Sequence, residues 1–234
     1  MRTAVLLFEL EGAMKIIQFM GVDWYVRPDG VGDPGGNNWK EENAFVDSDG
    51  YLHLKLTYES GEWYSSEVFT KDRFYFGTFQ FKVDAPLASM DKNVVLGLFQ
   101  YPTPDIGANG TNEIDIEIAQ WGNPAADRLD YTIWPVNAAL GPSGASFPLD
   151  LTGTWTTHRY KWSSSQIHFQ STHGHFDDNR YPIADYIFAP PDPLQRIAQH
   201  AMPVHMNLWA FGPPATHDAV EVVIMAANYY PPEA

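Results

Sequence analysis

A run of alternating acidic and apolar residues, 113–118, is the segment of this chain best suited to chemistry. Successive side chains of a β-strand point to opposite faces, so Glu113, Asp115 and Glu117 share one face. The isoleucines at 114, 116 and 118 share the other face and are expected in the core. Neighbouring carboxylates repel one another, and partial burial makes their charge more costly. The pattern therefore indicates a use for closely spaced carboxyl groups.

Hydrolysis of a glycosidic bond needs such a pair, one carboxylate as nucleophile or base and one carboxylic acid as proton donor. Cα atoms at i and i+4 of a strand lie roughly 13 Å apart, and leaning side chains shorten that distance. Retention needs carboxyl groups about 5–5.5 Å apart and inversion ~6.5–9.5 Å, so the spacing does not choose between them. A cation-binding face and a solvated acidic face remain alternatives.

Strands must position these groups, and strand signals dominate the chain. Segments bounded by Gly, Pro, Asn and Asp are expected to be strands at 51–57, 74–83, 94–101, 113–118, 129–134, 158–162, 166–170, 204–211 and 219–226. The best helix candidate is 193–200, and the glycine-rich segment 30–38 is expected to be a loop. Many short strands with almost no helix predict an all-β sandwich or jelly roll.

Size and composition fit one domain with one core. The chain has 234 residues, 44% of them hydrophobic, and we expect a single domain at 14–234 after an N-terminal extension at 1–13. Aromatic residues make up 15% of the chain, which serves either sheet packing or stacking on sugar rings.

The charge narrows the partners. With 29 acidic residues against 14 basic ones, the net charge is −15. A charge of this sign disfavours binding of nucleic acid, anionic membranes and acidic polysaccharides, and favours a neutral polysaccharide as the substrate. Solubility alone also explains the acidic composition. No cysteine is present, no apolar run reaches the ~20 residues of a membrane span, and the start of the chain is a poor signal peptide. No metal-ligand or phosphate-loop motif occurs, so neither a cofactor nor a metal is expected.

The sequence EIDIE at 113–117 resembles the catalytic strand of glycoside hydrolase family 16, in the unbulged form typical of lichenase-type β-glucanases. Further similar segments follow the family's order along the chain, at 63–68, 76–79, 97–101, 157–162 and 205–209. The resemblance implies a concanavalin-like jelly roll of two packed antiparallel sheets with a cleft open at both ends. It also implies a retaining mechanism with Glu113 as nucleophile, Glu117 as general acid/base and Asp115 as supporting acid.

The family resemblance and strand parity together give candidate substrate-binding residues: Asn37, Glu67, Tyr101, Trp121, Trp134, Asn207 and Trp209. Each tryptophan is either a sugar platform or a core residue, and Asn37 is either a cleft residue or a turn residue. Two positions depart from the lichenase pattern, Thr111 in place of Trp and Phe69 in place of Arg. These two departures predict that the cleft of this protein contacts its substrate differently from the cleft of a lichenase-type enzyme.

Three functions follow from these features. The first is a retaining endo-β-glycosidase for a β-1,3- or β-1,3-1,4-glucan, expected to be monomeric and extracellular or periplasmic. The second is a transglycosylase with the same site, and the third is a lectin-like module without catalysis. The intact set of three acids counts against the third.

Overall fold

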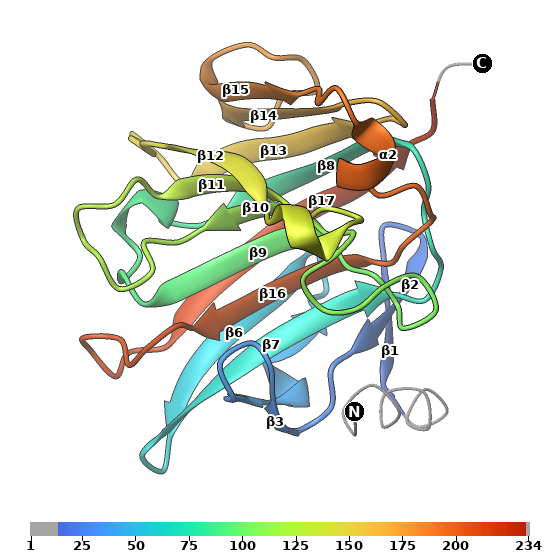
Figure 1. Ribbon diagram of the computed structural model, residues 1–234. Helices are drawn as coiled ribbons and strands as arrows, with labels where there is room; N and C mark the ends of the chain where they lie inside the picture. The colour runs from blue at the N-terminus through green and yellow to red at the C-terminus, as the bar shows by residue number, and fades with distance from the viewer. Residues whose placement is uncertain (1–13, 233–234) are drawn as a thin grey trace.

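The computed structural model describes residues 14–232, so the extension expected at 1–13 lies outside the described residues. One antiparallel sheet, here the carboxylate sheet, faces the viewer in Figure 1. Its strands, in spatial order, are β1 (Ile16–Phe19), β2 (Val22–Val26), β7 (Glu62–Thr70), β16 (Val204–Ala210), β9 (Val94–Gln100), β10 (Ile114–Ile118), β11 (Leu129–Ile133) and β12 (Ser143–Phe147).

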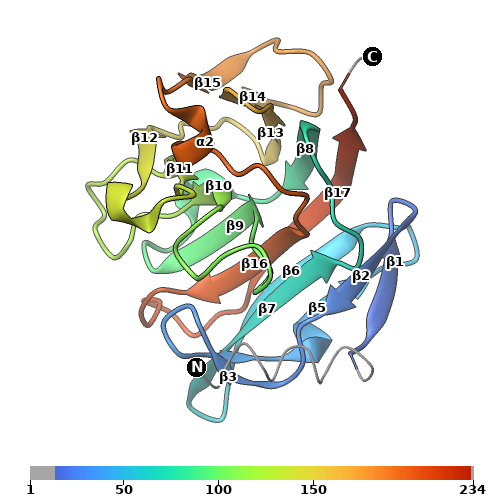
Figure 2. The same cartoon turned by 45° about the vertical axis from the view of Figure 1, so that its right-hand side comes forward.

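A second antiparallel sheet, here the back sheet, packs behind the first. Its strands are β5 (Ala44–Val46), β6 (Leu52–Glu59), β17 (Val220–Tyr230), β8 (Gly77–Asp84), β13 (Trp155–Trp162), β14 (Ile167–His173) and β15 (Pro182–Phe188). Figure 2 brings β8 and β17 into view beside β9 and β16. The predicted jelly roll of two packed antiparallel sheets is therefore confirmed.

Short elements complete the chain. The hairpin of β3 (Gly30–Gly32) and β4 (Asn37–Trp39) joins β7 through a parallel β4–β7 pairing. The helical pieces are η1 (Glu41–Asn43), η2 (Leu87–Ser89), η3 (Ala138–Leu140) and α2 (Pro193–Arg196). Among residues 14–232, no helix is long and apolar enough to cross a membrane.

The core lies between the two sheets and fixes which way β10 faces. Ile114, Ile116 and Ile118 are completely buried and belong to one apolar cluster with side chains of the back sheet. Tyr160 and Trp162 enter this cluster from β13. Because strand residues alternate, burying the isoleucines turns the acids of β10 away from the core.

Some expected boundaries were wrong. Segment 30–38 is not one loop, since Asn38 and Trp39 pair with β7. The strand expected from 74 begins at Gly77, because Gly77 has a φ of +151°, a conformation that side chains rarely adopt, and Phe74 before it forms only an isolated bridge with Met202. The helix expected at 193–200 stops at 196, where Ile197 takes an extended conformation and is buried.

A buried polar chain links the two sheets through His158 on β13. Its Nδ1 lies 2.8 Å from Ser171 Oγ and its Nε2 lies 2.9 Å from Thr156 Oγ1. The hydroxyl of Tyr131, on β11 of the carboxylate sheet, donates to the same Ser171 Oγ at 2.7 Å. Burial lowers the pKa of His158 to about 3, so the imidazole stays neutral in the folded protein.

This histidine predicts acid sensitivity. Below its ordinary pKa of 6.5 the unfolded chain binds a proton that the folded chain does not bind, so stability falls as the pH decreases. Between pH 6.5 and pH 4, this histidine lowers the free energy of unfolding by about 3 kcal/mol. Urea unfolding of the wild type and of His158→Gln at pH 6.5 and at pH 4 measures this loss of stability. The variant should lose less stability on acidification, and an equal loss in both proteins would contradict the assignment.

Candidate active site

Strand β10 lies in the carboxylate sheet with β9 and β11 as its neighbours. Its register is unbroken on both sides, with Ile116 opposite Leu98 on β9 and opposite Tyr131 on β11, so the unbulged form expected from the sequence is confirmed. Asp115 is 3% exposed, whereas Glu113 and Glu117 on the same outward face are partly exposed. Two accessible carboxyl groups thus flank a buried one.

Burial sets the protonation of these acids. It raises the pKa of Glu113 and of Glu117 to about 8, and the charge of Glu113 adds to the effect on Glu117. Burial and both neighbouring charges hold the pKa of Asp115 well above its usual range. A hydrogen bond between Asp115 and Glu113 raises the pKa of Asp115 and lowers that of Glu113. Asp115 is therefore the donor, and it favours the ionised form of Glu113.

A buried ion pair lies across the sheet from the three acids. Glu67 on β7 accepts from Arg27 Nη1 at 2.6 Å through Oε2, and His205 Nδ1 on β16 lies 2.9 Å from Oε1. Burial raises the pKa of Glu67, but the charge of Arg27 and the bond to His205 outweigh it, and the net shift is downward. Both carboxylate oxygens are engaged, so Glu67 orients Arg27 and His205. The sequence analysis predicted that Glu67 contacts the substrate, and it did not identify Arg27 as a residue of the site.

Asn207 lies between this ion pair and Glu117. The cross-strand register runs from Glu117 to Gly97 on β9, then to Asn207 on β16 and to Glu67 on β7. Asn207 is 5% exposed, and its Oδ1 has no hydrogen-bond partner among the described residues. A Cβ at Gly97 would lie 2.5 Å from that oxygen, so the glycine makes room for the amide. Asn207 thus keeps an unpaired acceptor beside the acids.

Aromatic rings gather around His205. Phe69 and Phe99 both stack on its imidazole with ring centroids 5.1 Å away, and Tyr101 lies 6.3 Å from Phe99. Burial and then the charge of Glu113 raise the pKa of Tyr101, so its hydroxyl stays a hydrogen-bond donor. Phe69, at the position where the sequence resemblance leads one to expect an arginine, stacks on His205 instead.

A second aromatic group forms around Trp209. The Trp209 side chain is 7% exposed and packs with Trp39. Trp121 lies 6.1 Å from Trp209 and meets Phe211 edge-on at 5.6 Å. Phe211 is half exposed, and Trp121 is partly exposed. These two rings are accessible, whereas Trp209 is largely a packing residue.

The last two candidates differ in their surroundings. Asn37 has a turn role, since its Nδ2 donates to the Pro34 carbonyl and its Oδ1 accepts from Ser65 Oγ at 3.1 Å. Trp134 follows β11, and its backbone N–H donates to the Glu113 carbonyl. Its partly exposed side chain is a hydrogen-bond partner of Asp115 that lowers the pKa of that acid. Trp134 is thus next to the acids, and the amide of Asn37 is already engaged.

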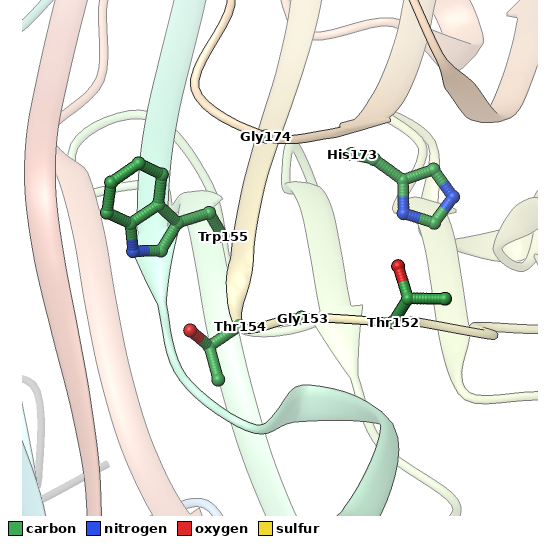
Figure 3. A pocket seen from close by; sticks show the side chains of 6 residues that line it. All are labelled: Thr152, Gly153, Thr154, Trp155, His173 and Gly174. Carbon is green, nitrogen blue, oxygen red and sulfur yellow. The ribbon is translucent and has the colours of Figure 1, made fainter.

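A hollow of about 340 Å³ lies elsewhere, at the start of β13 in the back sheet. Figure 3 shows Trp155 and His173 directed to opposite sides of the chain there. The exposed Trp155 ring stacks on His175 at 4.9 Å. The carboxyl groups of β10 do not line this hollow.

No family model matches the sequence, and no curated protein matches it. Solved structures do match its fold. The β-glucanase of Bacillus licheniformis has a TM-score of 0.69 and 16% identity, covering 91% of this chain and 94% of its own.

Two further structures cover similar shares. A glycoside hydrolase family 16 protein of the Bacteroides ovatus mixed-linkage glucan locus has a TM-score of 0.65 and 11% identity over 93% and 98% of the two chains. An immunostimulatory antigen of Mycobacterium tuberculosis, described as a pseudo β-1,3-glucanase, has a TM-score of 0.66 and 18% identity over 90% and 91%. The chain therefore has the jelly-roll fold of the family 16 β-glucanases.

Proposed function

We propose that the protein is a member of glycoside hydrolase family 16, a retaining endo-hydrolase of β-glycosidic bonds in a neutral polysaccharide. A β-1,3- or β-1,3-1,4-glucan is the favoured substrate. The observation that carries the proposal is the unbulged strand β10, whose acids face outward with raised pKa values. The fold supports it, since proteins of the same fold include β-glucanases.

The first step is formation of a glycosyl-enzyme. Burial raises the pKa of both glutamates to about 8, so the reactive form of the site is the one in which only one of them is ionised. The hydrogen bond from Asp115 lowers the pKa of Glu113 and so favours Glu113 as the carboxylate that attacks the anomeric carbon. As the C–O bond breaks, its electron pair goes to the leaving oxygen, and Glu117 gives that oxygen its proton. The raised pKa of Glu117 keeps this proton in place near neutral pH.

The second step returns the enzyme to its starting state. Glu117, now a carboxylate, removes a proton from water as the water oxygen attacks the anomeric carbon. The bond to Glu113 breaks, and its electron pair returns to the carboxylate. Two inversions at one carbon give net retention. A sugar hydroxyl in place of water would give transglycosylation by the same steps.

The side chains around the acids favour the binding of an uncharged polysaccharide at sugar units inside its chain. Aromatic rings gather around His205 and around Trp209, and sugar rings stack on such faces. Arg27, across the sheet from the acids, is paired with Glu67 and lies over the Trp39 ring at 3.8 Å. The net charge of −15 further disfavours acidic polymers.

Release of reducing ends from a panel of β-1,3-glucan, mixed-linkage glucan, galactan and xyloglucan tests the proposal. Wild type should cleave a β-glucan, and Glu117→Gln should not cleave it. Binding without cleavage by wild type would instead indicate a lectin-like module. Products that form only with an added oligosaccharide would indicate a transglycosylase.

The space at Gly97 gives a second test of the same site. Gly97→Ala should displace the Asn207 amide, the flexible end of a side chain, so the fold should survive. We expect kcat/KM to fall roughly 10- to 100-fold. Gly153→Ala is the matched control, because a Cβ there meets nothing within 4 Å. Equal activity of the two variants would show that Asn207 has no part in catalysis or binding.

A further inference from the structure

Asp130, on β11, is a further carboxyl group in the site, beside the three acids of β10 and Glu67 of β7. It is the direct cross-strand neighbour of Glu117. Its Oδ2 accepts from Trp121 Nε1 at 3.1 Å, and its Oδ1 accepts from Ser146 Oγ on β12. Burial raises the pKa of Asp130, and these two hydrogen bonds lower it. The carboxyl group thus contacts the acid strand on one side and an aromatic side chain on the other.

Trp121 depends on this contact for its place. Its φ is +51°, in the left-handed region that a bulky residue rarely adopts unless its surroundings hold it there. The bond to Asp130 and the rings of Trp209 and Phe211 hold the side chain there. The partly exposed indole therefore has a fixed orientation close to Glu117.

The titratable and charged groups that face Glu117 come from its own strand and from the strands on either side. Glu113 and Asp115 share its strand, and Asp130 faces it from β11. On the other side, Gly97 of β9 carries no side chain, and beyond it Glu67 is paired with Arg27 and hydrogen-bonded to His205. Burial, then Glu113, then Asp130 raise the pKa of Glu117. Of the three acids that face Glu117 from β10 and β11, Asp130 is the one outside the EIDIE run.

We infer that Asp130 is a positioning residue with two roles. It fixes the Trp121 indole as a stacking surface for a sugar ring bound next to Glu117, and its charge keeps the proton on Glu117. The inference rests on the proposed function, in which Glu117 is the general acid. It adds a determinant of pH dependence and of sugar binding that lies outside the three acids of β10.

Three substitutions separate the roles, and the first of them, Asp130→Ala, removes both the charge and the acceptor oxygens. Asp130→Asn removes the charge and keeps an acceptor oxygen and the side-chain volume. Trp121→Phe keeps a ring and removes the N–H donor. Asp127→Asn is the matched control, because it removes one acid from an exposed position three residues away on the chain.

The first readout uses the free protein and no substrate. A ¹³C NMR titration of the Glu117 carboxyl, assigned with Glu117→Gln, should show its pKa falling by about one pH unit in Asp130→Asn and not in Asp127→Asn. The Trp121 indole N–H signal should be protected from exchange in wild type and lose protection in Asp130→Ala. An unchanged Glu117 pKa would overturn the charge role, and an unprotected indole in wild type would overturn the positioning role.

The second readout is kinetic. In Asp130→Asn the alkaline limb of kcat/KM should move to lower pH by a similar amount, while KM stays close to the wild-type value. Trp121→Phe should raise KM several-fold and leave the pH limb in place. A uniform loss at every pH in Asp130→Asn would overturn the inference. If the NMR results appear as expected but wild type cleaves no polysaccharide, the proposed function fails and the coupling of Asp130 to Glu117 stands.

Discussion

Glu113→Ala is expected to lower the hydrolysis of a β-glucan on the order of 10⁵-fold, because the glycosyl-enzyme needs this carboxylate. Alanine leaves an open space beside Asp115. Azide should enter that space and attack the anomeric carbon of an activated β-glycoside directly. The product is then a glycosyl azide of inverted configuration, identified by NMR.

The azide result separates Glu113 from a residue that only supports the fold. The melting temperature and polysaccharide binding should stay close to wild type in Glu113→Ala. Glu117→Ala treated with azide should give the opposite anomer, because its nucleophile is intact. Full activity of Glu113→Ala, or an azide of retained configuration from it, would show that Glu113 is not the nucleophile.

Glu117→Gln is expected to affect substrates according to their leaving groups. With a polysaccharide the loss should be about 10²- to 10⁴-fold, the usual contribution of general acid–base catalysis. With a dinitrophenyl glycoside, which needs no proton on its leaving oxygen, formation of the glycosyl-enzyme should be nearly unaffected. The alkaline limb of the pH profile should also disappear. Equal losses with both substrates would contradict the role of general acid.

The same substitution has a pH-dependent effect on stability. Burial raises the pKa of Glu117 above its unfolded value of 4.5, to about 8. The folded protein therefore holds a proton that the unfolded chain releases, and this contribution to stability is lost as the pH rises towards 8. Glutamine does not ionise, so the stability of the variant relative to wild type should increase from pH 5 to pH 8 in urea unfolding.

The alternation of acidic and apolar residues at 113–118 made strand β10 predictable. A strand that buries Ile114, Ile116 and Ile118 must present Glu113 and Glu117 on its other face, whatever the rest of the fold. The apolar run of β9 was predictable for a related reason, since successive residues of β9 are buried on both faces of the strand, and a strand buried on both faces reads as continuously hydrophobic. Local patterns thus gave the strands of the site and the direction of its acids.

The residues that contact these acids from neighbouring strands were not predictable from the sequence. Asp130 meets Glu117 through the β10–β11 register, and Arg27 reaches Glu67 from 40 residues away. Register depends on turn geometry and core packing, which a local pattern does not record. Strand β3 was missed because Gly30-Val31-Gly32 has the composition of a loop. Asn37 was ambiguous because amides suit both turns and clefts.

The most direct test of a double displacement at Glu113 and Glu117 is the anomeric configuration of the first product. Proton NMR during cleavage of a β-glucan by wild type follows the new reducing end before it mutarotates. A retaining mechanism predicts that the β-anomer is formed first and the α-anomer follows at the rate of mutarotation. Formation of the α-anomer first would show inversion and would contradict the assignment of Glu113 as a covalent nucleophile.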